Sequence, residues 1–237
     1  MRIHYIIHAS FEKLGMIESW IEKNQFQASG THTYKGEKLP DVSAFDLLIL
    51  MGGPQSVRKL DQYPYLRDEI ALAKNAIQQG KAVLGICLGA QLVGEALGAR
   101  AEQSPCREVG IYPVHATQEA AADPFFKQLP KAFDVIHWHN DMPGLPKGSV
   151  LLASSAGCPR QAFRYGDRVY GLQFHLEITP ELMRDMIEHC RDDLKPSDYV
   201  QTAEQLVNQD VTAINQKMEK ILDYLASCIA KTKVKST

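Results

Sequence analysis

The stretch KAVLGICLGAQ, residues 81–91, joins a short apolar run to a segment with helical spacing of its apolar residues. Residues 81–86 are typical of a buried central strand, because the run is apolar on both faces. From Leu88 to Leu97 the pattern is helical, so Cys87 lies at the junction of a strand and a helix. Such strand-to-helix units are the building blocks of an α/β fold with a mainly parallel central sheet.

The same alternation extends on both sides of this stretch, with helices expected on both faces of the sheet. Helices are expected around residues 14–21, 66–77 and 88–97, with a glycine at position 80 where the second should end. The sequence becomes rich in strands after residue 98, and Gly166-Asp167 is typical of a hairpin turn. The expected strands are residues 3–8, 46–51, 81–86, 109–114, 133–138, 150–153, 161–165 and 169–174, with a further strand and loop at 26–34.

The C-terminal part of the chain is predicted to be helical. Thr179-Pro180 is a favourable helix start, with threonine as the cap and proline in the first turn. A second helix is expected from about Tyr199 to Ala230, with one apolar face. That face either packs on the core or forms a dimer or partner surface. We therefore expect one domain over residues 1–237, with an α/β core at 1–178 and a helical extension at 179–237.

Composition excludes several classes of function. The 237 residues include 26 Lys and Arg against 28 Asp and Glu, a net charge of -2 that offers no broad field for nucleic acid or anionic lipid. No apolar run approaches the roughly 20 residues that a membrane span needs. The N-terminus fits a first strand better than a secretion signal, which predicts a cytoplasmic protein. The five cysteines are odd in number and lack a C-x-x-C pair, so neither a disulfide framework nor a zinc motif is indicated.

Cys87 is flanked by Gly85 and Gly89 in the pattern G-x-C-x-G, which has the form of a nucleophile elbow. A sharp turn there would lift the thiol clear of the backbone, and glycines would let neighbouring elements and a substrate come close. The start of the following helix would favour the thiolate, and the N–H of Leu88 could bind an oxyanion. The alternative is a buried structural cysteine between two packing glycines.

Two further segments favour the catalytic interpretation. His175 and Glu177 are two residues apart in GLQFHLE, a spacing that places both on one face of a strand. The histidine could take the thiol proton while the carboxylate orients the ring, as in cysteine forms of the catalytic triad. MGGPQS, residues 51–56, follows a buried strand, and Gly53 could supply a second N–H to an oxyanion hole.

Taken in order, GGP, GICLGAQ and GLQFHLE make the chain resemble the class I glutamine amidotransferase domain, and in pattern the glutaminase domain of GMP synthetase. The resemblance implies a flavodoxin-like fold and a Cys87, His175 and Glu177 triad that hydrolyses the side-chain amide of glutamine through a γ-glutamyl thioester. It also implies that Gly53 and Leu88 form the oxyanion hole. No cofactor is implied.

The resemblance assigns substrate binding as well. Gln91, on the helix after Cys87, would help to hold glutamine, although it could be an ordinary polar helix residue. His139, Asn140 and Asp141 fall where the family has S-H-G-D, with asparagine in place of glycine. Asparagine tolerates a positive φ better than most residues. His137 and His139 could be metal ligands, but with no third ligand at a supportive spacing we predict no metal site. Arg107-Glu108 resembles a family R-E-x-G segment that borders the pocket.

Ammonia made in such a site normally passes to a synthetase domain. The chain has no G-x-x-x-x-G-K-[ST] loop, and only 60 residues follow Glu177. The leading hypothesis is a stand-alone glutaminase that acts on L-glutamine and supplies ammonia to a separate synthetase chain. A γ-glutamyl peptidase and a non-catalytic small-molecule-binding regulator are the alternatives. The acceptor is not encoded in any motif, and a homodimer is left open.

Overall fold

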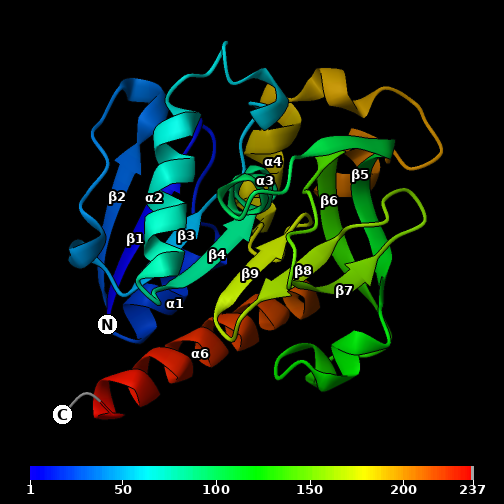
Figure 1. The fold of residues 1–237 in the computed structure, drawn as a ribbon. Coiled ribbons are helices and arrows are strands. Elements are labelled where there is room, and N and C mark those ends of the chain that lie inside the picture. Colours follow the sequence, from blue (N-terminus) through cyan, green and yellow to red (C-terminus); the bar gives the residue numbers. More distant parts are fainter. Residues whose placement is uncertain (236–237) are drawn as a thin grey trace.

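The computed structural model describes residues 1–235 and contains one nine-stranded sheet with helices on both faces (Figure 1). The strands are β1 (Arg2–Ile7), β2 (Gln27–His32), β3 (Leu47–Leu50), β4 (Ala82–Ile86), β5 (Glu102–Ala116), β6 (Ala132–Met142), β7 (Val150–Ser154), β8 (Ala162–Tyr165) and β9 (Val169–Leu172). The α-helices are α1 (Met16–Lys23), α2 (Leu66–Gln78), α3 (Leu88–Ala96), α4 (Pro180–His189), α5 (Ala203–Val207) and α6 (Thr212–Lys235).

The strand order is β2-β1-β3-β4-β9-β8-β7-β5-β6. The neighbours from β2 to β9 pair in parallel, and those from β9 to β6 pair antiparallel. The predicted α/β class with helices on both faces is confirmed. Its parallel part is the half that contains β4, while the strand-rich segment after residue 98 forms the antiparallel half. The expected turn at Gly166-Asp167 joins β8 and β9, where Tyr165 pairs with Val169.

Each face of the sheet has its own apolar core, because neighbouring side chains of a strand point to opposite faces. Leu47 and Ile49 of β3 pack on the face covered by α1, α4 and α6. Leu48 and Leu50 pack on the other face, with residues of α2 and α3. All residues of β3 and β4 are buried, as expected for central strands with both faces covered. The carboxyl end of β4 therefore presents residue 87 from a rigid part of the sheet.

The C-terminal segment differs in part from its prediction. Helix α4 starts as expected, with Thr179 Oγ1 accepting a hydrogen bond from the Leu182 N–H. The single helix predicted from Tyr199 to Ala230 is wrong, because the structure has α5 and α6 in its place. Thr202 forms a capping box, so α5 begins at Ala203 rather than at Tyr199. Asp210 Oδ1 then accepts from the Thr212 N–H, which starts the separate helix α6. Apolar periodicity continues across this break, which hid it.

Helix α6 lies along the core, as the packing interpretation of its apolar face predicted (Figure 1). Ile214, Met218, Ile221 and Leu225 are buried in the core that α6 shares with α1. Trp20 of α1 also donates to Asp223 of α6 through its indole N–H, at 2.8 Å. None of the helices in the described part of the chain combines the length and the hydropathy of a membrane-spanning helix.

A buried histidine in β1 makes stability depend on pH. The ring of His4 contacts Ser29 Oγ at 2.8 Å and Thr31 Oγ1 at 3.0 Å, and burial lowers the pKa of His4 from 6.5 to about 4. Below pH 6.5 the unfolded chain therefore binds a proton that the folded chain does not, so this contribution to stability falls as the pH decreases from 6.5 to about 4.

We expect His4→Gln, which can keep both hydrogen bonds, to remove this loss. Between pH 7 and pH 4 the free energy of unfolding should decrease in both proteins. The decrease should be smaller in the variant than in the wild type, by up to about 3 kcal/mol. Urea denaturation at a series of pH values measures the difference. If the free energy of unfolding depended on pH equally in the two proteins, the lowered pKa of His4 would be contradicted.

Candidate active site

Cys87 sits in a strained turn between β4 and α3. Its φ of 52° and ψ of -109° are unusual, and Gln25 is the other non-glycine residue with positive φ in the described part of the chain. The Cys87 N–H donates to Leu172 O of β9 at 2.8 Å, which anchors the turn to the sheet. Strain of this kind costs about 1–3 kcal/mol and persists where the surroundings impose it. This is the backbone geometry of a nucleophile elbow.

The flanking glycines are required by backbone packing. A Cβ atom on Gly85 would overlap with the carbonyl of Gly89, and one on Gly89 would overlap with the carbonyl of Leu50. The Gly89 N–H donates to Met51 O at 3.1 Å, so the start of α3 is held against the end of β3. Leu88 is the first residue of α3, where N–H groups have no acceptor within the helix. Its N–H is therefore available to an anion beside Cys87.

His175 and Glu177 follow β9 and form a buried pair. His175 Nδ1 lies 2.6 Å from Glu177 Oε1, and Glu177 Oε2 accepts from the Leu176 N–H at 3.0 Å. Burial alone would lower the pKa of His175, but the charge of Glu177 and the interaction with Cys87 raise it well above 6.5. The ring is thus poised to carry a positive charge next to Cys87. The predicted pairing of these side chains is present.

The loop after β3 is fixed by a second buried pair. His8 Nε2 lies 2.8 Å from Glu69 Oε2, and His8 Nδ1 lies 2.8 Å from Gly52 O. Burial alone would lower the pKa of His8, but the charge of Glu69 and these two hydrogen bonds raise it, so both ring N–H groups can donate. Because a trans peptide directs its C=O and N–H oppositely, holding Gly52 O turns the Gly53 N–H away from His8.

Two glutamine side chains link α3 to Cys87. Gln91 Nε2 donates to Gln173 Oε1 at 3.1 Å, and Gln173 Nε2 lies 3.5 Å from Cys87 Sγ. The Cys87 thiol is also 3.7 Å from Trp138 O. Gln91 Oε1 is buried without a hydrogen-bond partner, so it can accept from a bound molecule. Gln173 and Trp138 were missed by the sequence reasoning, although both lie inside the segments it singled out.

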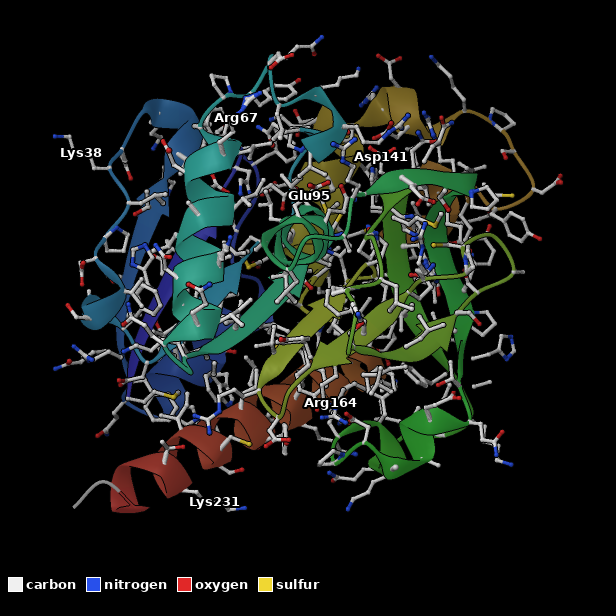
Figure 2. The ribbon with its side chains drawn as sticks, viewed as in Figure 1. Lys38, Arg67, Glu95, Asp141, Arg164 and Lys231 are labelled. Atoms are coloured by element: carbon white, nitrogen blue, oxygen red, sulfur yellow. The ribbon has the colours of Figure 1, made fainter. Side chains whose placement is uncertain are left out.

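The segment from His139 to Asp141 reaches the site from the end of β6. Asp141 accepts from Ser56 Oγ at 2.6 Å and from Arg58 at 2.8 Å, so it joins β6 to the loop after β3. Figure 2 shows Asp141 in the upper part of the view, above and to the right of α3. Asn140 is exposed and does not have the positive φ for which its tolerance was invoked. His139 borders the site, but its Nε2 is turned to Glu108 at 3.1 Å.

These side chains surround a cavity of about 580 Å³. Every predicted site residue except Glu177 lines it, and Glu177 lies behind His175. Arg58 and Arg107 also line the cavity, together with Glu12 and Cys190. The described structure thus brings all the predicted residues to one place, with a thiol, a histidine and free N–H groups at its base.

Comparison with known proteins agrees with this geometry. The profile of the family Glutamine amidotransferase class-I matches residues 2–192. The chain belongs to the class I glutamine amidotransferase family. It is 39% identical over 232 residues to the glutamine amidotransferase-like protein YfeJ of Salmonella typhimurium, covering 95% of this chain and 97% of YfeJ. It is 38% identical over 142 residues to the GMP synthase of Thermosipho africanus, covering 59% of this chain but 26% of that synthase.

Solved structures of similar proteins share the whole fold of this amidotransferase. The crystal structure of SMU.1228c is 40% identical with a TM-score of 0.90, covering 95% of this chain and all of that one. A glutamine amidotransferase from Thermotoga maritima is 28% identical with a TM-score of 0.84, covering 96% of this chain and 97% of that one. The predicted family, its fold and its general enzyme class are therefore confirmed. The chain is a class I glutamine amidotransferase with its helical C-terminal segment included in the likeness.

Proposed function

We propose that the chain is a stand-alone glutaminase that releases ammonia from glutamine through a γ-glutamyl thioester on Cys87. The observation that carries this proposal is the strained Cys87 turn beside the buried His175 and Glu177 pair. A non-catalytic regulator would gain nothing from holding a cysteine at a φ of 52°. The raised pKa of His175, which the charge of Glu177 and the contact with Cys87 cause, also fits a catalytic acid and base.

The proposed reaction uses these groups in turn. The Cys87 thiolate attacks the side-chain amide carbon, and the oxyanion that forms accepts hydrogen bonds from the N–H groups of Gly53 and Leu88. The imidazolium of His175 gives its proton to the amide nitrogen, which leaves as ammonia. A water molecule then attacks the thioester and passes a proton to His175. Glutamate leaves, and the thiolate and imidazolium are restored.

Polar groups at the cavity wall support the binding of an amino acid. The free Oε1 of Gln91 can accept from the substrate amide N–H₂. The carboxylate of Asp141 has an opposite charge to the α-ammonium, and Arg58 and Arg107 have an opposite charge to the α-carboxylate. In this proposal Asn140 contributes its backbone rather than its exposed side chain. His139 lies on the same strand as Asp141 and borders the same cavity.

The two enzymatic alternatives differ in whether ammonia is released and passed on. The chain matches GMP synthases over about a quarter of their length, and this similarity supports a separate synthetase chain that would use the ammonia. The cavity of about 580 Å³ also has room for a γ-glutamyl dipeptide, which supports the peptidase alternative. Both reactions would use the same thioester.

Glutamate release from L-glutamine and from a set of γ-glutamyl dipeptides tests the proposal. We expect glutamine to be hydrolysed, with turnover increased by the synthetase chain that accepts the ammonia. Both substrates should be assayed alone and with candidate synthetases from the same cell. A strong preference for the dipeptides would replace the first function with the second. Release of glutamate from neither substrate, in any of these mixtures, would reject both.

A further inference from the structure

Four buried side chains meet behind the candidate active site. Glu108 comes from β5, His137 and His139 come from β6, and Gln161 precedes β8. Glu108 pairs directly with His139 across the two antiparallel strands. Glu108 is 1% exposed and Gln161 is fully buried. Solvent therefore neither screens the charge of Glu108 nor hydrogen-bonds to the amide of Gln161. The proposed glutaminase mechanism uses none of Glu108, His137 and Gln161.

The polar atoms of this cluster form a distorted tetrahedron with edges from 2.7 to 3.6 Å. Glu108 Oε2 lies 3.1 Å from His139 Nε2 and 3.6 Å from His137 Nδ1. The two histidine nitrogens are 3.4 Å apart. The amide nitrogen of Gln161 lies 2.7 Å from the carboxylate, 3.3 Å from His137 and 3.2 Å from His139. The centre of such a tetrahedron is about 2.0 Å from each corner, which matches the bond lengths of Zn²⁺ to nitrogen and oxygen.

The outer hydrogen bond of His137 leaves one lone pair pointing into the cluster. His137 Nε2 donates to Tyr112 O at 3.3 Å, which leaves Nδ1 as the acceptor nitrogen toward the cluster. A metal-bound histidine is typically held by such a bond from its other nitrogen. The His137 lone pair then faces a carboxylate oxygen, an arrangement that a cation between them would stabilise.

Gln161 provides an independent indication. Its Oε1 is buried without a hydrogen-bond partner, while its Nε2 occupies a corner of the tetrahedron. Amide oxygen and nitrogen have almost the same shape, so a half-turn of the amide exchanges them without moving other atoms. That half-turn would place an oxygen ligand at the fourth corner. The oxygen that now has no hydrogen-bond partner would then face the ion.

We propose that Glu108, His137, His139 and Gln161 bind one Zn²⁺ ion in a closed tetrahedral site. Two imidazoles, a carboxylate and an amide oxygen suit Zn²⁺ and exclude soft ions that need thiolates. With four protein ligands and no open position, the ion is structural rather than hydrolytic. It would tie β5, β6 and Gln161 together and so fix the strand that carries His139 and Asp141. Glu108, the candidate third ligand, lies opposite His139 on the neighbouring strand, so no spacing in the sequence indicates it.

The test measures metal binding in a Cys87→Ser background, which removes the thiol of the active site. Chelator-treated protein is titrated with Zn²⁺ against a chromophoric competitor, and with Co²⁺ while its visible absorption is recorded. We expect one ion per chain, a tetrahedral Co²⁺ spectrum without thiolate charge transfer, and a rise in melting temperature. His137→Gln and Glu108→Gln should each weaken Zn²⁺ binding by at least about 100-fold.

His4→Gln is the matched control, because it removes a buried histidine of β1 outside the cluster. Its Zn²⁺ affinity should equal that of the background protein. Equal binding by His137→Gln, or a thiolate band in the Co²⁺ spectrum, would overturn the proposal. Where a ligand variant does not fold, two other measurements test the site. Gln161→Met should weaken Zn²⁺ binding, and the background protein should give the tetrahedral Co²⁺ spectrum. Absence of stoichiometric binding in that background would also overturn it.

Discussion

Cys87→Ser is expected to lower the turnover of glutamine by at least about 10⁴-fold, the cost typical of removing a nucleophile from a triad. The serine hydroxyl does not ionise near neutral pH, so it cannot form the ion pair with His175 that a thiolate forms. The turn itself should persist, because it is held by the Cys87 N–H and by Gly85 and Gly89. Initial rates of glutamate release measure the loss.

A second thiol in the same cavity provides the control. Cys190 lines the cavity, and burial, with the charge of Asp193, raises the pKa of this thiol to about 12. Cys190→Ser should therefore keep most of the turnover. A glutamine analogue with an electrophile at the side-chain amide should add one mass adduct to the wild type and none to Cys87→Ser. An adduct that persists in Cys87→Ser would show that Cys87 is not the nucleophile.

The strands of the sheet were predictable where both faces of a strand are buried. Strands β3 and β4 have apolar residues on both faces, so their sequences are continuous apolar runs with sharp ends. The order of the antiparallel half was not predictable, because pairing of strands far apart in the chain depends on packing rather than on local pattern. The break between α5 and α6 was missed for a related reason. Its capping groups at Thr202 and Asp210 lie within an unbroken apolar period.

The candidate site divides in the same way. Cys87, His175 and Glu177 were found because their spacing reflects local geometry, a turn in one case and a strand end in the other. Glu108 was given no role because its partners are on a neighbouring strand, and no local spacing records such a contact. The buried pair of His8 and Glu69 that holds the Gly52 carbonyl was missed for the same reason.

Glu177→Gln is expected to lower kcat by about 10⁴-fold, the effect known for neutralising the third member of a triad. The reason lies in two hydrogen bonds. Glu177 accepts from the Leu176 N–H at 3.0 Å and from His175 Nδ1 at 2.6 Å, whereas an amide has one oxygen. If that oxygen faces Leu176, the N–H₂ group faces Nδ1 and forces the proton onto Nε2. His175 then cannot accept the proton of Cys87.

The pH dependence distinguishes this orienting role from a general loss of structure. Burial alone lowers the pKa of His175, and the charge of Glu177 is the largest influence that raises it. Removing that charge should therefore lower the pKa of His175, which NMR titration of the ring measures directly. Glu12→Gln is the matched control, because Glu12 is a buried carboxyl near His175 whose own pKa is raised by burial. It should change turnover far less. An unchanged His175 pKa in Glu177→Gln would show that the carboxylate does not set the charge of the ring, and equal losses in the two variants would show that any nearby carboxylate serves.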